Sequence, residues 1–215
     1  MEYKYTILVC VHSQTDFHDG LLNNALKSLE DQTFKNFNTV IVLDQCWDNT
    51  IKNIKPPSNH TIYQRDRKEG LAFAKNFGLS KIDSEWVGFL DADDYYLPEK
   101  MEKQIAYIEN NDVDFLGTLA YDKLWRDGKK IVPSCYEPGR FSTHEKISAG
   151  IQKENMMCHG SMLIKKKCLD ALGSYENHVG HEDWDLWKRA IAAGYKFANL
   201  DERLYVWSCG TSVDR

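Results

Sequence analysis

Long apolar stretches are missing from this 215-residue sequence. No run approaches the roughly 20 apolar residues that a membrane-spanning helix needs. The first apolar run, Ile7 to Val11, is also too short for the core of a signal peptide, and polar His12 follows it at once. We therefore expect a cytoplasmic protein with no membrane span.

Paired cysteines are missing too, because none of the six cysteines belongs to a CxxC pair. In a chain without an export signal, an even number of cysteines does not imply disulfides, so free thiols are expected. A zinc site built from Cys158, His159 and His181 is conceivable, but the spacing matches no familiar zinc pattern.

An excess of positive charge is absent as well. The chain has 27 Lys and Arg against 32 Asp and Glu, a formal net charge of −5. This balance excludes a general attraction to nucleic acid or anionic lipid. With 42% hydrophobic and 27% charged residues, the composition is that of a globular protein. The length predicts one domain with a substantial core.

What the first half does contain is an alternation of strand and helix patterns. Strands are expected at residues 5–11, 39–43, 61–63 and 85–90, and helices at 22–29, at 71–78 and after Pro98. Such alternation predicts an α/β fold with a mostly parallel sheet covered on both faces. Ligands of such sheets bind at the carboxyl ends of the strands, here at His12, Asp44 and Asp91.

The second half is less regular. We expect a hairpin turn at residues 126–129, a strand at 160–165, a helix at 181–193, and a closing edge strand at 204–207. Trp184 and Trp187 fall on one face of that helix and are read as core residues.

Three aspartates in four positions, Asp91, Asp93 and Asp94, follow the apolar strand at 85–90. Carboxylates this close repel one another unless something positive is bound. Hard divalent cations prefer oxygen ligands, so Mg²⁺ or Mn²⁺ shared with substrate phosphates is the expected occupant. The alternative is that the aspartates cap the following turn.

The pair Asp91-x-Asp93 also fits the opening of a haloacid-dehalogenase phosphatase motif. That motif wants Thr or Val where this chain has Tyr95, and it lies on the first strand of its fold. We therefore favour the metal site over the phosphatase interpretation.

Together, five segments in this order resemble the family 2 glycosyltransferases, which have the GT-A fold, over nearly the whole chain. Residues 5–13 look like the opening strand, 42–50 are similar to the motif VDDGSTDNT, 70–78 match GlaaArNxG, 90–94 read LDADD, and 180–189 resemble the ED-x-x-L-x-x-R helix. The resemblance implies a Rossmann-like three-layer fold with a central, mostly parallel, mixed sheet. Residues 1–95 would bind the nucleotide sugar and residues 96–215 the acceptor, within a single domain.

The chain departs from the family pattern at several positions. Cys10 and Ser13 stand where proline and asparagine are usual, and Lys75 replaces an arginine. Many relatives carry a histidine near the last strand that reaches the metal or diphosphate, but residues 207–210 read Trp-Ser-Cys-Gly.

The resemblance also implies roles for individual residues in donor binding. His12, Asp44, Lys75 and Asp91 would contact the nucleotide sugar, with Asp44 on the base, which is expected to be uracil. Lys75 would neutralise or orient the donor. Asp91 and Asp93 would hold the Mn²⁺ or Mg²⁺ ion.

Asp183 is implied to be the catalytic base of a metal-dependent inverting transfer. An inverting reaction needs a stabilised leaving group on one side of the anomeric carbon and a base on the other. A metal-bound diphosphate meets the first need. Asp183 lies near the expected start of a helix, where plain N-terminal capping is the competing interpretation.

Two other functions stay open at this point. A nucleotidyltransferase would also use aspartate-bound metal, but residues 11–15 lack its glycine-rich, basic phosphate loop. A binding module without turnover is the non-enzymatic alternative, and the intact Asp91, Asp93 and Asp183 count against it. The acceptor, whether a glycan, a lipid-linked sugar, a protein or a modified nucleobase, is not determined by the sequence.

Overall fold

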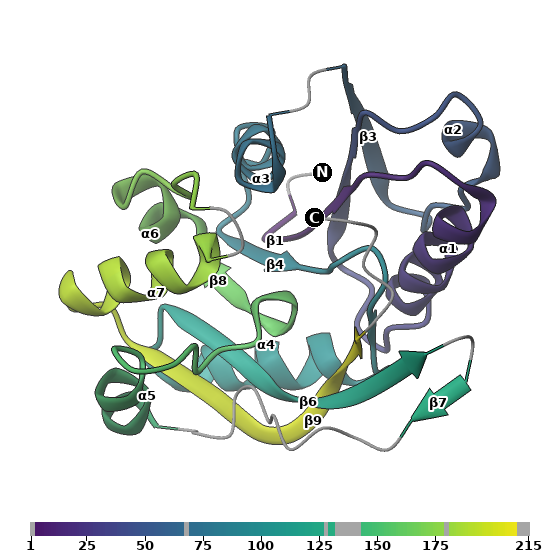
Figure 1. The fold of residues 1–215 in the computed structure, drawn as a ribbon. Helices are drawn as coiled ribbons and strands as arrows, with labels where there is room; N and C mark the ends of the chain where they lie inside the picture. Colours follow the sequence, from purple (N-terminus) through teal and green to yellow (C-terminus); the bar gives the residue numbers. More distant parts are fainter. Residues whose placement is uncertain (1–2, 67–68, 127–128, 132–142, 179–180, 210–215) are drawn as a thin grey trace.

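A mixed nine-stranded sheet forms the centre of the molecule in the computed structural model, which describes residues 3–66, 69–126, 129–131, 143–178 and 181–209. The strands follow one another in the order β3-β2-β1-β4-β8-β6-β9-β5, and β7 pairs with β6 outside this path (Figure 1). The expected α/β architecture with a mostly parallel sheet is confirmed.

The first four strands of this order are parallel: β1 (Tyr5–Val11), β2 (Asn38–Asp44), β3 (His60–Arg65) and β4 (Trp86–Phe89). Side chains of β1 alternate between two cores, with Ile7 and Val9 in one and Leu8 in the other. Helix α1 (Asp16–Glu30) covers the first face and α3 (Leu71–Leu79) the second (Figure 1). Burial on both faces explains why β1, β2 and β4 are mostly apolar, whereas β3 at the edge of the sheet is polar and largely unburied.

The second half of the chain extends the same sheet. Its strands are β5 (Tyr95–Tyr96), β6 (Phe115–Arg126), β7 (Lys129–Ile131), β8 (Leu163–Lys165) and β9 (Phe197–Cys209). Its helices are α4 (Lys100–Asn110), α5 (His144–Gly150), α6 (Lys166–Ala171) and α7 (Glu182–Ala192), and the short α2 (Thr50–Asn53) follows β2.

Two expectations for this half are corrected. The strand expected at 204–207 is part of the 13-residue β9, which lies between β6 and β5 and not at the edge. The strand expected at 160–165 is shorter, because the 3₁₀ turn η1 (His159–Ser161) precedes β8. That turn brings Gly160 so close to Tyr205 that an added Cβ would lie 1.9 Å from the tyrosine hydroxyl oxygen.

The hairpin expected at 126–129 is confirmed, since β6 and β7 pair with Arg126 opposite Lys129, although the turn residues 127–128 lie outside the described residues. Pro98 was expected in the first turn of its helix, but α4 begins at Lys100 with Glu99 as its N-cap. The Pro98 carbonyl instead accepts a hydrogen bond from the Thr33 backbone N–H. In the part of the chain described, none of the helices is long and apolar enough to cross a membrane.

Lys100 is fully buried under the sheet, and this burial predicts a pH-dependent stability. Its Nζ donates to Gln104 and lies 3.8 Å from the centroid of the Tyr96 ring. Burial holds the pKa of Lys100 well below its usual range. Below pH of about 10 the unfolded chain therefore binds this proton more readily than the folded protein does.

We expect the free energy of unfolding of the wild type to rise from pH 7 to 9 relative to Lys100→Met, by up to about 1.4 kcal/mol per pH unit. Urea unfolding at each pH measures the difference. Lys103→Met on the same helix is the matched control, because Glu202 and Glu99 raise the pKa of Lys103 to about 12. Parallel stability curves for wild type and Lys100→Met would contradict this assignment.

Candidate active site

The carboxyl ends of β1, β2 and β4 bring the three expected ligand positions to one edge of the sheet. Strand β1 lies between β2 and β4, with Val11 opposite Leu43 and Leu8 opposite Phe89. The exposed His12 places Nδ1 2.8 Å from the Asp44 carbonyl oxygen. The loops that follow β1 and β2 are thus tied together at this edge.

Asp44 is buried and forms an ion pair with a residue that the sequence analysis missed. Arg65 Nη1 lies 3.1 Å from Asp44 Oδ1, yet both atoms are without a hydrogen-bond partner among the described residues. Burial raises the pKa of Asp44, and the Arg65 charge opposes that rise. The guanidinium also bonds Glu69 and lies over the Phe77 ring of α3. An acceptor and a donor with unused hydrogen-bonding capacity therefore lie side by side.

A weak signal for Arg65 was present in the sequence, because it stands two residues after the end of the strand expected at 61–63. In the parallel pairing of β2 with β3, Asp44 lies opposite Arg65. Without the register, however, the position of Arg65 beside Asp44 could not be read from the pattern.

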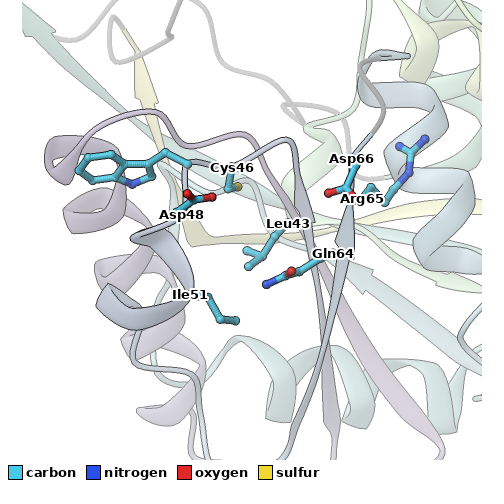
Figure 2. Close-up of a pocket in the computed structure, with 8 residues that line it drawn as sticks. Leu43, Cys46, Asp48, Ile51, Gln64, Arg65 and Asp66 are labelled. Carbon is cyan, nitrogen blue, oxygen red and sulfur yellow. The ribbon is translucent and has the colours of Figure 1, made fainter.

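A cavity of about 220 Å³ lies beside the end of β2 (Figure 2). Its lining consists of Leu43, Cys46, Trp47, Asp48, Ile51, Gln64, Arg65 and Asp66. Leu43 belongs to the core under α1, whereas Asp44, one residue further, pairs with the arginine that contacts α3. The cavity is formed by the loop and the short helix after β2 together with the end of β3.

The loops at this edge are braced by the buried Asp19. Its carboxylate accepts hydrogen bonds from Ser13 Oγ, Thr50 Oγ1, Trp47 Nε1 and Asn53 Nδ2. Burial alone would raise the pKa of Asp19, but these hydrogen bonds together lower it. The loops after β1 and β2 are thereby held as one unit beside the site.

The acidic cluster after β4 divides into two kinds of residue. Asp94 is only 1% exposed and accepts hydrogen bonds from the Tyr205 hydroxyl at 2.5 Å and the Ser208 backbone N–H at 2.6 Å. Asp94 thus fastens β9 to the cluster, and its side chain bonds this distant strand rather than capping the turn that follows. Asp91 and Asp93 are half-buried.

The electrostatics of this cluster fit a divalent cation. The pKa of Asp94 is raised well above its usual range by burial, followed by the charges of Asp91 and Asp93. Such mutual repulsion is what a bound cation would relieve, and carboxylate oxygens are the ligands that Mg²⁺ and Mn²⁺ prefer.

Lys75 connects α3 to α7, the helix that carries the expected base. Gly70, with φ 101° in the region that favours glycine, precedes the start of α3. Lys75 Nζ is buried, lies 3.0 Å from Glu182 Oε1 and 5.2 Å from the Tyr175 ring centroid. Glu182 was not singled out in the sequence, although it stands beside Asp183 in the ED motif.

Asp183 lies in the first turn of α7, and the structure describes contacts for both of its carboxylate oxygens. Oδ1 accepts the backbone N–H of Trp184 at 2.7 Å, and Oδ2 accepts Asn155 Nδ2 at 2.9 Å. Asp183 therefore has the expected position at the start of a helix. Its partner Asn155 is a residue of the site that the sequence analysis missed.

Burial, followed by charges that include those of Asp91 and Asp183, raises the pKa values of two buried side chains, Cys158 and Tyr175. After burial itself, Asp94, Asp91 and Asp183 are among the charges that raise the pKa of Cys158. The pKa of Tyr175 is likewise raised by burial and then by charges that include Asp183 and Asp91. The Tyr175 ring also packs against Phe89 of β4, with ring centroids 6.0 Å apart, and against Lys75, whose ion pair with Glu182 reaches the start of α7.

The zinc interpretation is not supported among the described residues, because Cys158, His159 and His181 form no ligand cluster there. His159 is buried among aromatic rings and bonds the Tyr175 hydroxyl, and burial holds its pKa well below its usual value. Trp187 is fully buried, as expected of a core residue. Cys10, Cys46, Cys158 and Cys168 are free thiols.

The sequence of this chain matches a known enzyme family over most of its length. The model of glycosyl transferase family 2 matches residues 6–173. The chain belongs to glycosyl transferase family 2. The match includes the acidic cluster after β4 and ends before α7.

Relatives of this family 2 member carry glycosyltransferase names. An uncharacterized glycosyltransferase of Methanocaldococcus jannaschii is 31% identical over 189 residues, which cover 85% of this chain and 64% of that protein. The putative glycosyltransferase EpsE of Bacillus subtilis is 28% identical over 195 residues, which cover 86% of this chain and 66% of that protein. The family 2 chain thus spans about two thirds of the length of these relatives.

Solved structures confirm the GT-A fold. S. aureus TarS in complex with UDP-GlcNAc has a TM-score of 0.73 at 18% identity, with 98% of this chain and 60% of that chain covered. The mannosyltransferase PcManGT of Pyrobaculum calidifontis, in complex with GDP-Man and Mn²⁺, has a TM-score of 0.74 at 16% identity. The match covers 98% of this chain and 58% of that chain.

Proposed function

We propose that this chain is a metal-dependent inverting glycosyltransferase that moves a sugar from a nucleotide-diphosphate donor, expected to be a UDP-sugar, to an acceptor hydroxyl. The observation that carries this proposal is the set of contacts that joins the end of β4 to the start of α7. The Tyr175 ring packs against Phe89 of β4 and against Lys75, whose Nζ lies 3.0 Å from Glu182, the residue before Asp183. The nucleotide sugars in the complexes of TarS and PcManGT, and the Mn²⁺ of the latter, support it.

In this proposal the nucleotide base binds at Asp44 and Arg65. Uracil offers an N–H donor between two carbonyl acceptors. The Asp44 carboxylate accepts that N–H, while the guanidinium of Arg65 donates to the neighbouring carbonyl. Both groups retain hydrogen-bonding capacity in the described structure, and this supports the pairing. His12 lies beside them at the end of β1 and contacts the nucleotide.

Asp91 and Asp93 are the residues that would hold Mn²⁺ or Mg²⁺, with Asp91 also reaching the ribose or diphosphate. A bound divalent cation supplies charge neutralisation for a departing diphosphate. Lys75 contributes a further positive charge on the donor side, which its ion pair with Glu182 fixes in place.

Asp183 accepts the proton of the acceptor hydroxyl as that oxygen attacks the anomeric carbon. The attack comes from the face opposite the diphosphate, so the configuration inverts. A carboxylate is a sufficient base because proton transfer accompanies attack on an oxocarbenium-like carbon. Residues 1–95 would thus bind the donor, and residues 96–215 would bring the base and acceptor.

Metal-dependent stabilisation by nucleotide sugars tests this function. A UDP-sugar present at about 100 times its Kd stabilises the native state by about 2.7 kcal/mol, which corresponds to a Tm rise of about 5–10 °C for a chain of this size. We expect this shift with Mn²⁺ and not with EDTA, measured by thermal melting against UDP-, GDP- and ADP-sugars.

Assays of the products extend this test. Release of UDP from a UDP-sugar, with the sugar passed to an acceptor hydroxyl or to water, supports the glycosyltransferase. Binding without any turnover would favour the non-enzymatic module. Release of pyrophosphate from UTP in the presence of a sugar 1-phosphate would favour a nucleotidyltransferase. A protein that responds to no nucleotide sugar contradicts the proposal.

A further inference from the structure

Asn155 faces the expected base with a side chain whose orientation is determined by its neighbours. Its Nδ2 lies 2.9 Å from Asp183 Oδ2, and its Oδ1 lies 3.2 Å from the Met157 backbone nitrogen. A backbone N–H can only donate, so the amide atom that faces Met157 is the carbonyl oxygen. The atom that faces Asp183 is therefore the NH₂ group, a hydrogen-bond donor.

The segment that carries Asn155 is anchored on both sides. Ile151 before it is fully buried, and Met156 and Met157 after it are 3% and 1% exposed. The Ile151 carbonyl accepts the indole N–H of Trp184 at 2.6 Å, so the segment is also tied to the residue after Asp183. Asn155 is thus presented to Asp183 from a packed segment 28 residues away in the sequence.

We infer that Asn155 is a positioning residue that orients the Asp183 carboxylate toward the acceptor hydroxyl, an inference that rests on the proposed function. Each carboxylate oxygen has two lone pairs. The Trp184 N–H uses one on Oδ1 and the Asn155 amide uses one on Oδ2, so both oxygens are held and still have a lone pair with which to accept a proton. A base held in this way meets the hydroxyl in a productive geometry.

A purely structural role for Asn155 would depend on bonds such as the one that its carbonyl accepts from the Met157 N–H. Asn155→Asp separates the two roles, because aspartate has the same shape and keeps an oxygen facing the Met157 N–H. It replaces only the NH₂ group, and thereby turns the contact with Asp183 from a hydrogen bond into a repulsion between carboxylates.

We expect Asn155→Asp to lower kcat for transfer by about 10–100-fold, the size of effect seen when residues that orient a functional group are removed. The KM for the donor should stay within about twofold of wild type. Steady-state release of UDP, with water as the acceptor and the concentration of the UDP-sugar that gives the largest thermal shift varied, measures both, and thermal melting checks the fold. Asn155→Ser tests the same bond if the aspartate variant is destabilised.

Asn23→Asp is the matched control, because Asn23 has the same two-sided pattern in another place. Its Nδ2 donates to the Asn53 carbonyl and its Oδ1 accepts the Lys55 N–H. We expect its kcat to be that of wild type. Normal kcat in Asn155→Asp, with Asp183→Asn inactive, would overturn the inference and leave the proposed function intact. Absence of transfer by the wild type itself would overturn both.

Discussion

Asp183→Asn is expected to lower the rate of sugar transfer by about 10²–10⁴-fold, the contribution typical of a positioned general base. Asparagine has nearly the same shape but cannot take the proton of the acceptor hydroxyl. Donor binding should stay near that of wild type, because the donor contacts are assigned to β1, β2 and β4. Transfer assays and donor titration, carried out on the same preparation, measure the two quantities separately.

Asp185→Asn is the matched control for this substitution. Asp185 lies one half-turn further along α7 and bonds Arg189 Nε at 2.7 Å. Its loss is expected to leave transfer unchanged. If Asp183→Asn lost donor binding together with transfer, Asp183 would not be the base, and its helix-terminal hydrogen bonds would be the better account of it.

Asp93→Asn is expected to weaken Mn²⁺-dependent donor binding by more than about 100-fold, since even residues that only support a metal ligand are worth 10–100-fold. The amide removes a negative charge from the acidic cluster, and a neutral oxygen is a poorer partner for a hard divalent cation. Titration of the nucleotide sugar with and without Mn²⁺, followed by the Tm, measures the loss.

Asp83→Asn provides the comparison at the other end of the same strand. Asp83 is exposed and precedes β4, whereas Asp93 follows it. We expect the Mn²⁺-dependent shift to be unchanged in this variant. An Asp93→Asn protein that kept the full Mn²⁺-dependent shift would remove Asp93 from the metal site. The two aspartate substitutions, at positions 93 and 183, should thus separate donor binding from transfer.

Much of the fold was readable because its first half follows local periodicity. The strand expected at residues 5–11 is β1 to the residue, and the helix expected at 22–29 lies within α1. These patterns are local, since each depends on which side chains an element must bury. The order of the short motifs along the chain indicated the family for a similar reason, because each motif is contiguous in sequence.

The second half was harder because its elements are defined by partners distant in sequence. The apolar residues 204–207 do not reveal whether β9 is an edge or an interior strand; its pairing with β6 and β5 decides that. The three aspartates after β4 likewise look equivalent in the sequence. Asp94 differs from the other two because Tyr205 and Ser208 reach it from β9.

By itself, the sequence determined the α/β class, the family and the carboxylates that can bind a cation or accept a proton, because residue type and local spacing carry that information. Only the tertiary structure decided how these groups are partnered. Lys75 meets Glu182 across 107 residues, Arg65 meets Asp44 through strand register, and Asn155 meets Asp183 across 28 residues. Such contacts depend on how packed elements bring distant segments together, which no local pattern specifies.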